Sequence, residues 1–408
     1  MVAGGIARWL LIGLMGLLGL VASWDIVCRA AAHYFARNDP AAALAWSPGD
    51  PEALAMLSDD RLVGRGTAKN LASAEILARQ ALAAAPLQAG ALRNLGLVAD
   101  ARGQTGKASE VMDRARRRGF RDIATQAWLL QRALGRSEFD DAFLRLDAIL
   151  RTKPDLSGRL FPALAAISTA PGSIDPLARR LATRPAWRTA ALLYLADETS
   201  SLTAITGLTE GLVRLRSPPS EQEEAGLLSR MVKEGRYQEA RRVWASLLPA
   251  GSRADGALVY DGAFRGLAGA APFNWRLFPS AGLSVETAKS SASRKSGLFV
   301  DYPVRDPATL ADQLLVLPPG TYRLTARFQI TGAAAGASLG WTVRCAAGDA
   351  VLGETRQKAD VATPWTALAT TFTVPPDCPA QWLRLGGRAG DGFGDLSALY
   401  DDVAVTAA

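Results

Sequence analysis

A repeated spacing of large and small apolar residues, which follows Pro48 and again Pro86, constrains the fold of the first half of this chain. In the second repeat it is carried by Leu92, Leu95, Gly96, Gly103, Ala108, Met112 and Ala115. Small residues such as Gly96 and Ala108 let two antiparallel helices approach closely, while Leu and Met side chains fill the groove between them. Gly103 interrupts the helical pattern between the two sets. The spacing therefore predicts pairs of antiparallel helices that follow one another along the chain.

This order of residues is typical of the tetratricopeptide (TPR) repeat, whose unit has about 34 residues. A degenerate unit runs from Ile123 to Pro154, and TPR-like spacing returns from Leu227 to Trp244. We therefore predict a TPR-like α-helical array over residues 31–252. Arrays of this kind present extended binding surfaces, so we expect one or more protein partners on the helical repeats, although no residue identifies them.

Residues 1–30 are predicted to be a membrane anchor or a signal. Every position from Trp9 to Trp24 is apolar or small. A cleaved signal peptide is one alternative, because small residues suited to cleavage stand at 21–23 and at 30–32. We favour an uncleaved, single-pass inner-membrane helix over residues 9–28, because the helical pattern continues beyond it into the repeats.

From Ala257 onward the pattern changes to short alternating runs separated by Gly, Pro and Asp. Trp341, Val343 and Cys345, for example, alternate with polar residues at a period of two, as expected for a strand with one buried face. Many short strands at this spacing predict a β-sandwich or jelly roll over residues 257–406. The expected fold class is multidomain: a transmembrane helix, an all-α TPR-like array and an all-β jelly roll.

Two of the three cysteines lie in the predicted sandwich. Cys345 ends an alternating strand, and Cys378 precedes the strand Gln381–Leu385. In an oxidising compartment such a pair predicts a disulfide. The alternative is two small buried thiols, which are common in protein cores. The apolar N-terminus favours the disulfide, and with it a location in which the bulk of the chain lies in the periplasm.

Composition argues against several classes of function. His33 is the one histidine in 408 residues, which nearly excludes His-based metal sites and Ser-His or Cys-His catalysis. There is neither a Walker-type phosphate loop nor a dinucleotide fingerprint. Lys and Arg number 46 against 39 Asp and Glu, and the dense run Arg114–Arg118 indicates either an anion-binding surface or a solvated helix end. We prefer the helix end, because no aromatic residues accompany the run. We expect no enzymatic activity, cofactor or nucleic-acid partner.

Four stretches of the C-terminal part are Tyr260-Asp261-Gly262-Ala263-Phe264, Pro272-Phe273-Asn274-Trp275, Gly320-Thr321-Tyr322-Arg323-Leu324 and Tyr400-Asp401-Asp402-Val403. Through them this part resembles the jelly-roll modules of carbohydrate-binding families. With the anchor, the TPR-like helices and the Pro-x-Trp-Arg helix that starts at Pro185, the whole chain resembles a group of proteobacterial envelope proteins. Members often accompany exopolysaccharide or O-antigen assembly, so the resemblance implies a role in envelope polysaccharide assembly or export.

One position departs from the carbohydrate-binding families. In those families an acidic residue usually follows the first-strand Phe and helps to bind a structural calcium ion. Here Arg265 follows Phe264, so that ligand is missing. Asp391, Asp395 and Asp402 are weak calcium candidates, because carboxylates near a Gly-rich loop could supply oxygen ligands. A solvated loop is the preferred interpretation, since the spacing matches no calcium loop.

Aromatic residues of the predicted sandwich are candidates for stacking on sugar rings, because a flat, stiff ring can hold the apolar face of a sugar. The candidates are Trp275, Tyr302, Trp365 and Trp382. Core packing is the alternative, and we prefer it for Trp341, which shares its parity with Val343. Trp382 has the opposite parity to Leu383 and is expected to face outward.

Two functions remain open from the sequence, and a glycoside hydrolase is a third that we do not favour. The first is a non-catalytic, membrane-anchored periplasmic TPR scaffold in polysaccharide assembly or export. The second is a glycan-binding protein that acts through its jelly roll and binds a polysaccharide. Outward aromatics gathered on one face of the sandwich would favour the second.

Overall fold

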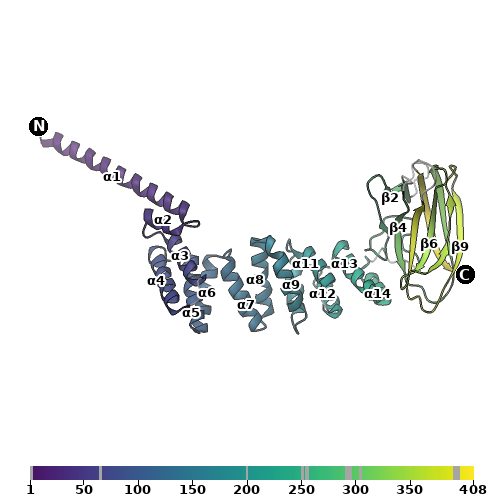
Figure 1. The fold of residues 1–408 in the computed structure, drawn as a ribbon, viewed down its shortest axis with the longest axis horizontal. Helices are drawn as coiled ribbons and strands as arrows, with labels where there is room; N and C mark the ends of the chain where they lie inside the picture. Colours follow the sequence, from purple (N-terminus) through teal and green to yellow (C-terminus); the bar gives the residue numbers. More distant parts are fainter. Residues whose placement is uncertain are drawn as a thin grey trace. The chain divides into compact units, whose positions relative to one another are not determined.

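The computed structural model describes residues 3–63, 67–198, 201–249, 252, 257–289, 296–302, 306–388 and 396–408. The predicted order of helices followed by a β-sandwich is confirmed (Figure 1). The chain divides into two compact units. The first comprises Met1–Leu160 with Pro185–Trp187, and the second comprises Phe161–Arg184 with Arg188–Ala408.

The first unit consists of helix pairs. Its helices are α1 (Ala3–Phe35), α2 (Pro40–Trp46), α3 (Pro51–Val63), α4 (Ala68–Ala84), α5 (Ala89–Ala101), α6 (Thr105–Arg118), α7 (Ile123–Gly135), α8 (Phe139–Thr152) and the 3-10 helix η1 (Pro154–Leu156). Helix α3 packs on α4, α5 on α6 and α7 on α8 (Figure 1). Three or four residues separate the helices of each pair in the sequence, so sequence neighbours become packing neighbours.

The contact between α5 and α6 depends on small residues. A Cβ atom on Gly96 would lie 2.9 Å from Cγ of Met112, closer than side chains normally approach. Ala108 and Ala115 are buried, and Leu92 and Leu95 are half-buried. The absence of a side chain at Gly96 therefore lets Met112 fill the space between the two helices.

Arg93 links successive helix pairs of the first unit. Its guanidinium group pairs with Asp59 of α3 and, at 2.7 Å, with Oδ1 of Asp122 before α7. The neighbouring Asn94 donates to the carbonyl of Ala55 at 2.9 Å. The Arg114–Arg118 run, in contrast, ends α6, and three of its arginines form ion pairs with Glu110 or Asp113 of the same helix. This arrangement suits the solvated helix end that we preferred.

Helix α1 is long and apolar. Its segment Gly13–Phe35 meets the length and hydropathy expected of a membrane span, and the most apolar 18-residue stretch of this segment is not buried in the protein. Ala32, near the end of α1, is buried and packs with Ala43 of α2 and Ala53 of α3. With 33 residues, α1 is about 50 Å long, which exceeds the hydrocarbon thickness of about 30 Å in a bilayer.

In the second unit the helices are α10 (Ile174–Ala182), α11 (Arg188–Glu198), α12 (Leu202–Arg214), α13 (Glu221–Lys233) and α14 (Tyr237–Leu247), preceded by most of α9 (Ser157–Ser168). Ser220 begins α13 with a capping box, in which its hydroxyl accepts from the Glu223 N–H and the Glu223 carboxylate accepts from the Ser220 N–H. The Glu223 carboxylate is thereby fixed at the start of α13, where it receives the buried Arg188.

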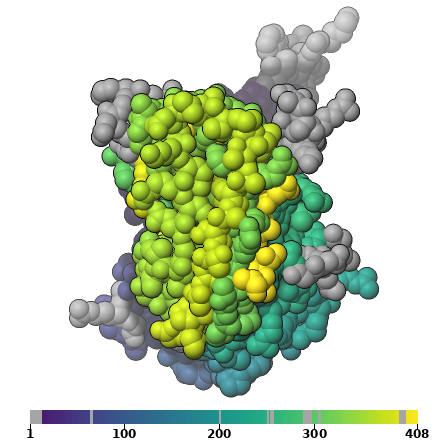
Figure 2. Space-filling view, turned by 90° about the vertical axis from the view of Figure 1, so that its right-hand side faces the viewer, coloured from purple at the N-terminus to yellow at the C-terminus, as the bar shows by residue number. Residues whose placement is uncertain are grey.

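The strands form two antiparallel sheets in the part of the chain that the structure describes. They are β1 (Arg276–Leu277), β2 (Ser284–Lys289), β3 (Ser296–Tyr302), β4 (Ala308–Leu315), β5 (Gly320–Gly332), β6 (Ser338–Cys345), β7 (Val351–Glu354), β8 (Gln357–Lys358), β9 (Thr366–Val374), β10 (Gln381–Arg388) and β11 (Leu396–Ala407). The six-stranded sheet has the order β1-β4-β10-β6-β7, with β8 also paired to β6, and the five-stranded sheet has the order β2-β3-β11-β5-β9. The sandwich fills the front of the space-filling view in green to yellow (Figure 2).

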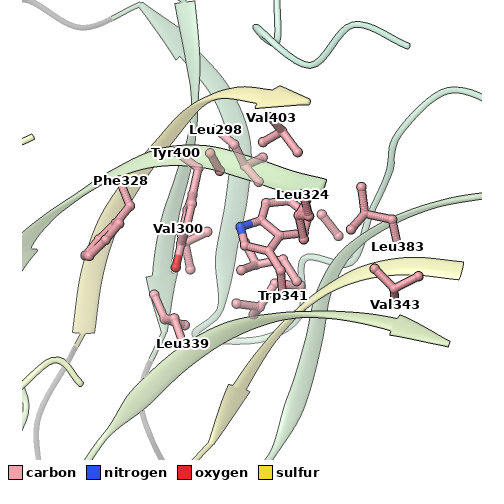
Figure 3. Close-up of a cluster of buried hydrophobic side chains, with 14 of the residues drawn as sticks. Leu298, Val300, Leu324, Phe328, Leu339, Trp341, Val343, Leu383, Tyr400 and Val403 are labelled. Carbon is pink, nitrogen blue, oxygen red and sulfur yellow. The ribbon is translucent and has the colours of Figure 1, made fainter. Parts of the chain in front are cut away.

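The core of the sandwich surrounds Trp341 of β6. Its indole ring is fully buried and lies among Leu298, Leu324, Leu383 and Tyr400 from strands of both sheets (Figure 3). The Tyr400 ring meets it edge-on at 5.7 Å. The parity of Trp341 with Val343 therefore indicated its position correctly, as a core residue.

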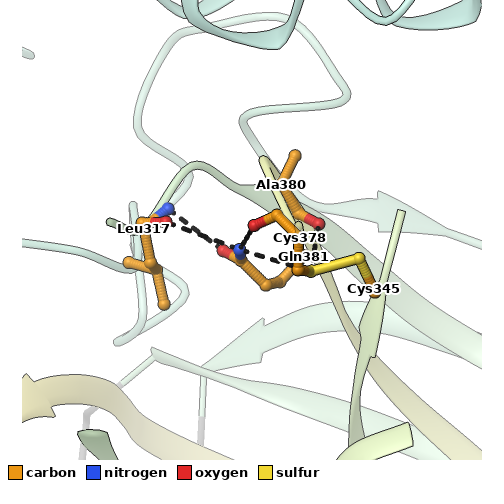
Figure 4. The surroundings of a disulfide bond; sticks show 5 residues. All are labelled: Leu317, Cys345, Cys378, Ala380 and Gln381. Carbon is orange, nitrogen blue, oxygen red and sulfur yellow. Dashed lines mark hydrogen bonds between the residues drawn. A yellow bond between two sulfur atoms is a disulfide. The ribbon is translucent and has the colours of Figure 1, made fainter. Parts of the chain in front are cut away.

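The disulfide predicted between Cys345 and Cys378 is present, with Cα atoms 5.6 Å apart (Figure 4). The buried Gln381 holds the adjoining backbone, because its side chain accepts from the Leu317 N–H at 3.0 Å and donates to the Cys378 carbonyl at 2.9 Å. The bridge thus joins the end of β6 to the segment that enters β10.

A second hydrophobic cluster covers part of the outer face of the six-stranded sheet. Trp244 of α14 meets Tyr260 edge-on at 4.8 Å and Phe273 at 5.7 Å, and Leu314 of β4 belongs to the same cluster. The side chain of Gln313 bonds both the N–H and the carbonyl of Tyr260, at 2.9 and 2.8 Å. Because this cluster occupies one end of the outer face, the other end of that face remains open to solvent.

Candidate functional site

A groove of ≈ 410 Å³ lies on the open part of this outer face. It is lined by residues of β4, β6, β7 and β10 together with Pro307, Asp349, Thr355 and Arg356, and most of these residues are polar or charged. Among the residues that the structure describes, no aromatic side chain lines it.

The alternation of β10 explains why charged side chains reach the groove. Leu383 and Leu385 point into the core, so Arg384 and Arg388 point outward. In the register with β6, Arg384 stands opposite Thr342, and Trp382 stands opposite Arg344. One face of two neighbouring strands therefore carries three arginines.

Two glycines form the middle of the groove floor, where Gly386 of β10 lies opposite Gly340 of β6. A Cβ atom on Gly340 would meet the Thr355 carbonyl oxygen at 2.2 Å, so a side chain is excluded there. A Cβ atom on Gly386 would come no closer to any atom than 3.4 Å, to the Ala308 carbonyl oxygen, and a larger side chain there would extend into the groove. A register shift in the pairing of β4 with β10 falls at Leu385 and Gly386 and bends the strand at this point.

The groove contains two carboxylates that accept hydrogen bonds from arginines. Asp349 binds Arg344 through both oxygens, each at 2.7 Å. The hydrogen bond from Arg344 holds the pKa of Asp349 below its usual value. Glu354 accepts from Arg356 at 3.1 Å and from Arg388 at 3.2 Å, both on the same oxygen.

A third carboxylate lies beneath the edge of the groove. Asp312 of β4 is buried and binds Arg276 through both oxygens at 2.7 Å. Arg384 approaches the same carboxylate only to 3.6 Å. Both guanidinium groups also lie over the ring of Trp382, at 4.7 Å for Arg276 and 5.4 Å for Arg384.

The four aromatic residues proposed to stack on sugars do not gather on one face. Tyr302 is 2% exposed, so its ring offers no face to a sugar, contrary to the sequence-based expectation. Trp275 is half-buried and contacts Phe264 and Trp341 at 5.0 and 5.6 Å, so packing against the core occupies it. The alternation of apolar and polar residues in the sequence did not show that Tyr302 and Trp275 are packed against the core.

The remaining two aromatics lie on different sheets. Trp382 faces outward from the six-stranded sheet, as its parity predicted, but it is half-buried beside Arg276 and Arg384. Trp365 stands just before β9 of the five-stranded sheet, with Arg327 over its ring at 5.3 Å. The arrangement therefore provides no shared aromatic platform among the described residues.

Two of the weak calcium candidates, Asp391 and Asp395, lie outside the described residues. Asp402 is exposed and faces Arg327 at 3.5 Å. No group of three or more possible metal ligands occurs in the described ranges. At the position of the family calcium ligand, the Arg265 N–H instead donates to the Asp261 carboxylate at 2.8 Å.

The arginines of the groove were not recognised from the sequence. A signal was present, because Arg384 and Arg388 share the parity of Trp382 and alternate with Leu383 and Leu385. The carboxylates that accompany them come from other parts of the sheet, Glu354 from β7 and Asp349 from the turn before it, and only the strand register shows their proximity.

No protein-family model and no curated protein matches the chain. Among solved structures, the chain is similar to TmCBM61 in complex with beta-1,4-galactotriose, with 14% identity over 36% of this chain and 92% of that chain and a TM-score of 0.26. It is also similar to a family 16 carbohydrate-binding module, with 17% identity over 36% of this chain and 99% of that chain and a TM-score of 0.26. These likenesses concern the fold alone.

Proposed function

We propose that this protein binds a glycan through its sandwich, in the groove on the outer face of the six-stranded sheet, and that it has no catalytic activity of its own. The observation that carries the proposal is the chemistry of the groove. Its walls present guanidinium, carboxylate and hydroxyl groups around a floor of two glycines.

These groups match the surface of a sugar. Sugar hydroxyls both donate and accept hydrogen bonds, and planar side chains such as Arg and Glu can bond two neighbouring hydroxyls at once. The bare backbone at Gly386 leaves room for a ring to approach the sheet. An apolar small molecule would find few partners here, because pockets for such ligands are lined mainly by hydrophobic side chains.

The test uses the full chain in detergent and affinity electrophoresis through gels that contain neutral or acidic polysaccharides. We expect at least one polysaccharide to retard the protein. Gly386→Leu should abolish that retardation, because the new side chain would fill the groove floor.

Ala369→Leu provides the matched control. Ala369 is exposed on β9 of the five-stranded sheet, so this variant adds the same bulk to the other outer face. Retardation that survives Gly386→Leu, or that Ala369→Leu removes equally, would place binding elsewhere and contradict the proposal.

The second proposed function is a scaffold that holds a protein partner on TPR-like helices, anchored in the inner membrane by α1 with the remainder in the periplasm and acting in polysaccharide assembly or export. A groove of ≈ 390 Å³ between α12 and α14 favours a partner site, because Val213, Val243 and Leu247 line it together with polar residues. The apolar length of α1 and the disulfide support the anchor and the oxidising compartment.

Co-purification from membranes tests this second function. A protein that accompanies the wild type should be lost from Val213→Asp and retained by Ile76→Asp, which changes another exposed apolar residue, on α4 in the first unit. Equal recovery with both variants would exclude the α12–α14 groove as the partner site.

A further inference from the structure

The charges in the sandwich groove do not balance. Four guanidinium groups line it, from Arg344, Arg356, Arg384 and Arg388, against the two carboxylates of Asp349 and Glu354. Among the described lining residues the positive charge therefore exceeds the negative charge by two. Arg344 and Asp349 form a complete bidentate pair, so the excess belongs to the other arginines.

Arg384 accounts for part of this excess. Asp312, the carboxylate with which it forms an ion pair among the described residues, already binds Arg276 through both oxygens at 2.7 Å, and Arg384 stands 3.6 Å away. The charge of Arg384 also acts on Asp349, whose two oxygens are bound by Arg344. Its Nε atom is buried and has no hydrogen-bond partner within the described structure. This buried Nε atom is the one that stands 3.6 Å from Asp312, and no hydrogen bond from the two Nη atoms occurs among the described residues. A guanidinium group has five N–H donors, so the donors left for a ligand are those on the Nη atoms.

Arg388 and Arg356 account for the remainder. Both donate to a single oxygen of Glu354, so one negative charge is shared between two positive charges. Arg384 and Arg388 are four residues apart on one strand, which separates them by about 13 Å. A short stretch of one extended polymer could therefore place one anionic group beside Arg384 and another beside Arg388.

Aromatic stacking does not offer an alternative source of affinity in this groove. Trp382, which faces outward from β10, already has two guanidinium groups over its ring. Hydrogen bonds between guanidinium and carboxylate groups are among the strongest in proteins and carry geometric specificity.

We propose that the groove selects acidic glycans, whose carboxylates bind Arg384 and Arg388. This inference rests on the proposed glycan-binding function and names its substrate class. It predicts discrimination between a polyuronate and its neutral counterpart, since the backbone and linkages of the two polymers are the same.

The experiment measures the affinity of the full chain in detergent for polygalacturonate, polymannuronate and polyglucuronate. Each is compared with its carboxyl-reduced form, in which every carboxylate has become a primary alcohol. At least one polyuronate should bind about tenfold or more tightly than its reduced form, as expected for one or two charge-assisted hydrogen bonds. Polyglutamate, a polymer of carboxylates without sugars, should bind no better than the reduced glycans.

Variants assign the effect to the groove. Arg384→Gln and Arg388→Gln should each remove most of the preference for the acidic form, whereas Arg384→Lys should retain part of it. Arg323→Gln is the matched control, because Arg323 is exposed on β5 of the five-stranded sheet and its loss changes the net charge equally.

Each other outcome overturns a defined part of the argument. Equal affinity for acidic and reduced forms, or a preference that Arg384→Gln and Arg388→Gln leave intact, would refute selection by these arginines while leaving glycan binding in place. Binding of polyglutamate as tight as that of the polyuronate would mean that negative charge alone explains the preference, without recognition of the sugar. Failure to bind any polysaccharide, neutral or acidic, would remove the proposed function itself.

Discussion

Two arginines of the second unit differ in how completely their hydrogen-bonding groups are satisfied. Arg188 is buried at the start of α11 and donates to the Glu223 carboxylate from Nε and Nη2. Its remaining donors reach the Ser217 hydroxyl at 2.7 Å and the backbone carbonyls of Leu181, Ser217 and Pro218. Arg384, in the groove, forms one ion pair among the described residues, at 3.6 Å with Asp312, which it shares with Arg276.

This difference separates a structural charge from a charge suited to binding. A buried ion removed from water must find all its partners within the protein, and Arg188 does so. An arginine with unused donors beside a groove can supply them to a ligand without breaking the fold. Exposure alone would not distinguish the two, since the Nε atom of Arg384 is also buried.

Replacing Arg188 should have the largest effect on stability. Arg188→Met leaves Glu223 buried without its cationic partner, so we expect a loss of about 3–5 kcal/mol in the free energy of unfolding. Urea denaturation followed by tryptophan fluorescence measures this change.

The surface pair of Arg214 and Asp175 is the control. The two groups are 3.0 Å apart and both side chains are well exposed. Arg214→Met should therefore lower the free energy of unfolding by about 1 kcal/mol or less. The double variant Arg188→Met/Glu223→Leu should recover much of the loss, because it removes the orphaned carboxylate as well. A cost for Arg188→Met similar to that for Arg214→Met would show that the buried pair contributes no more than a surface one.

Much of the fold could be predicted from the sequence. The period-two alternation of Trp341, Val343 and Cys345 placed β6 with the correct face inward, and the cysteine pair followed from two strand contexts. Small residues at Gly96 and Ala108 indicated where α5 and α6 meet. These features are local, because a few neighbouring residues determine which side of a strand or helix is buried.

The groove could not be predicted in the same way. Most of its residues come from β4, β6, β7 and β10, and their proximity depends on strand order and register rather than on spacing in the sequence. The partner of Arg188 posed the same difficulty, since Glu223 is 35 residues away at the start of another helix. From the sequence we proposed aromatic residues, and no arginines, for the binding site, yet Tyr302 is a core residue.

The adjacent carboxyl groups of Glu223 and Glu224 have pKa values that are shifted in opposite directions. Burial alone would raise the pKa of Glu223, but the Ser220 N–H, Arg188 and Thr189 outweigh it and lower that pKa. For Glu224, burial and then the charge of Glu221 raise the pKa to about 7, and its Oε1 has no hydrogen-bond partner within the described structure. The two adjacent carboxyls should therefore respond oppositely to pH.

The raised pKa of Glu224 predicts that stability is lost as the pH rises. Below about pH 4.5 the carboxyl is protonated in both the folded and the unfolded state, so it carries no penalty. Between that pH and about 7 the unfolded state ionises first and is favoured, and above about 7 the penalty is complete. Glu224→Gln should therefore be more stable than the wild type by about 1–3 kcal/mol at pH 8, and equally stable near pH 4.5.

Urea denaturation of both proteins at the two pH values measures this difference. Glu221→Gln should reproduce a smaller part of the gain, because the charge of Glu221 is the lesser cause of the shift. A stability difference between wild type and Glu224→Gln that does not change with pH would mean that Glu224 is ionised normally in the folded protein.

The smallest expected effect on stability belongs to Arg384, whose side chain is 32% exposed. Arg384→Gln leaves Asp312 with both of its bonds to Arg276, and so we expect the free energy of unfolding to change by about 1 kcal/mol or less. Arg276→Gln is the informative comparison, because it takes the bidentate partner from the buried Asp312 and should destabilise the protein more. Denaturation curves of the two variants, measured beside their affinity for a polyuronate, decide the matter. If Arg384→Gln costs as much as Arg276→Gln, Arg384 is a structural arginine like Arg188, and its loss of glycan affinity would follow from a damaged sheet rather than from a missing ligand contact.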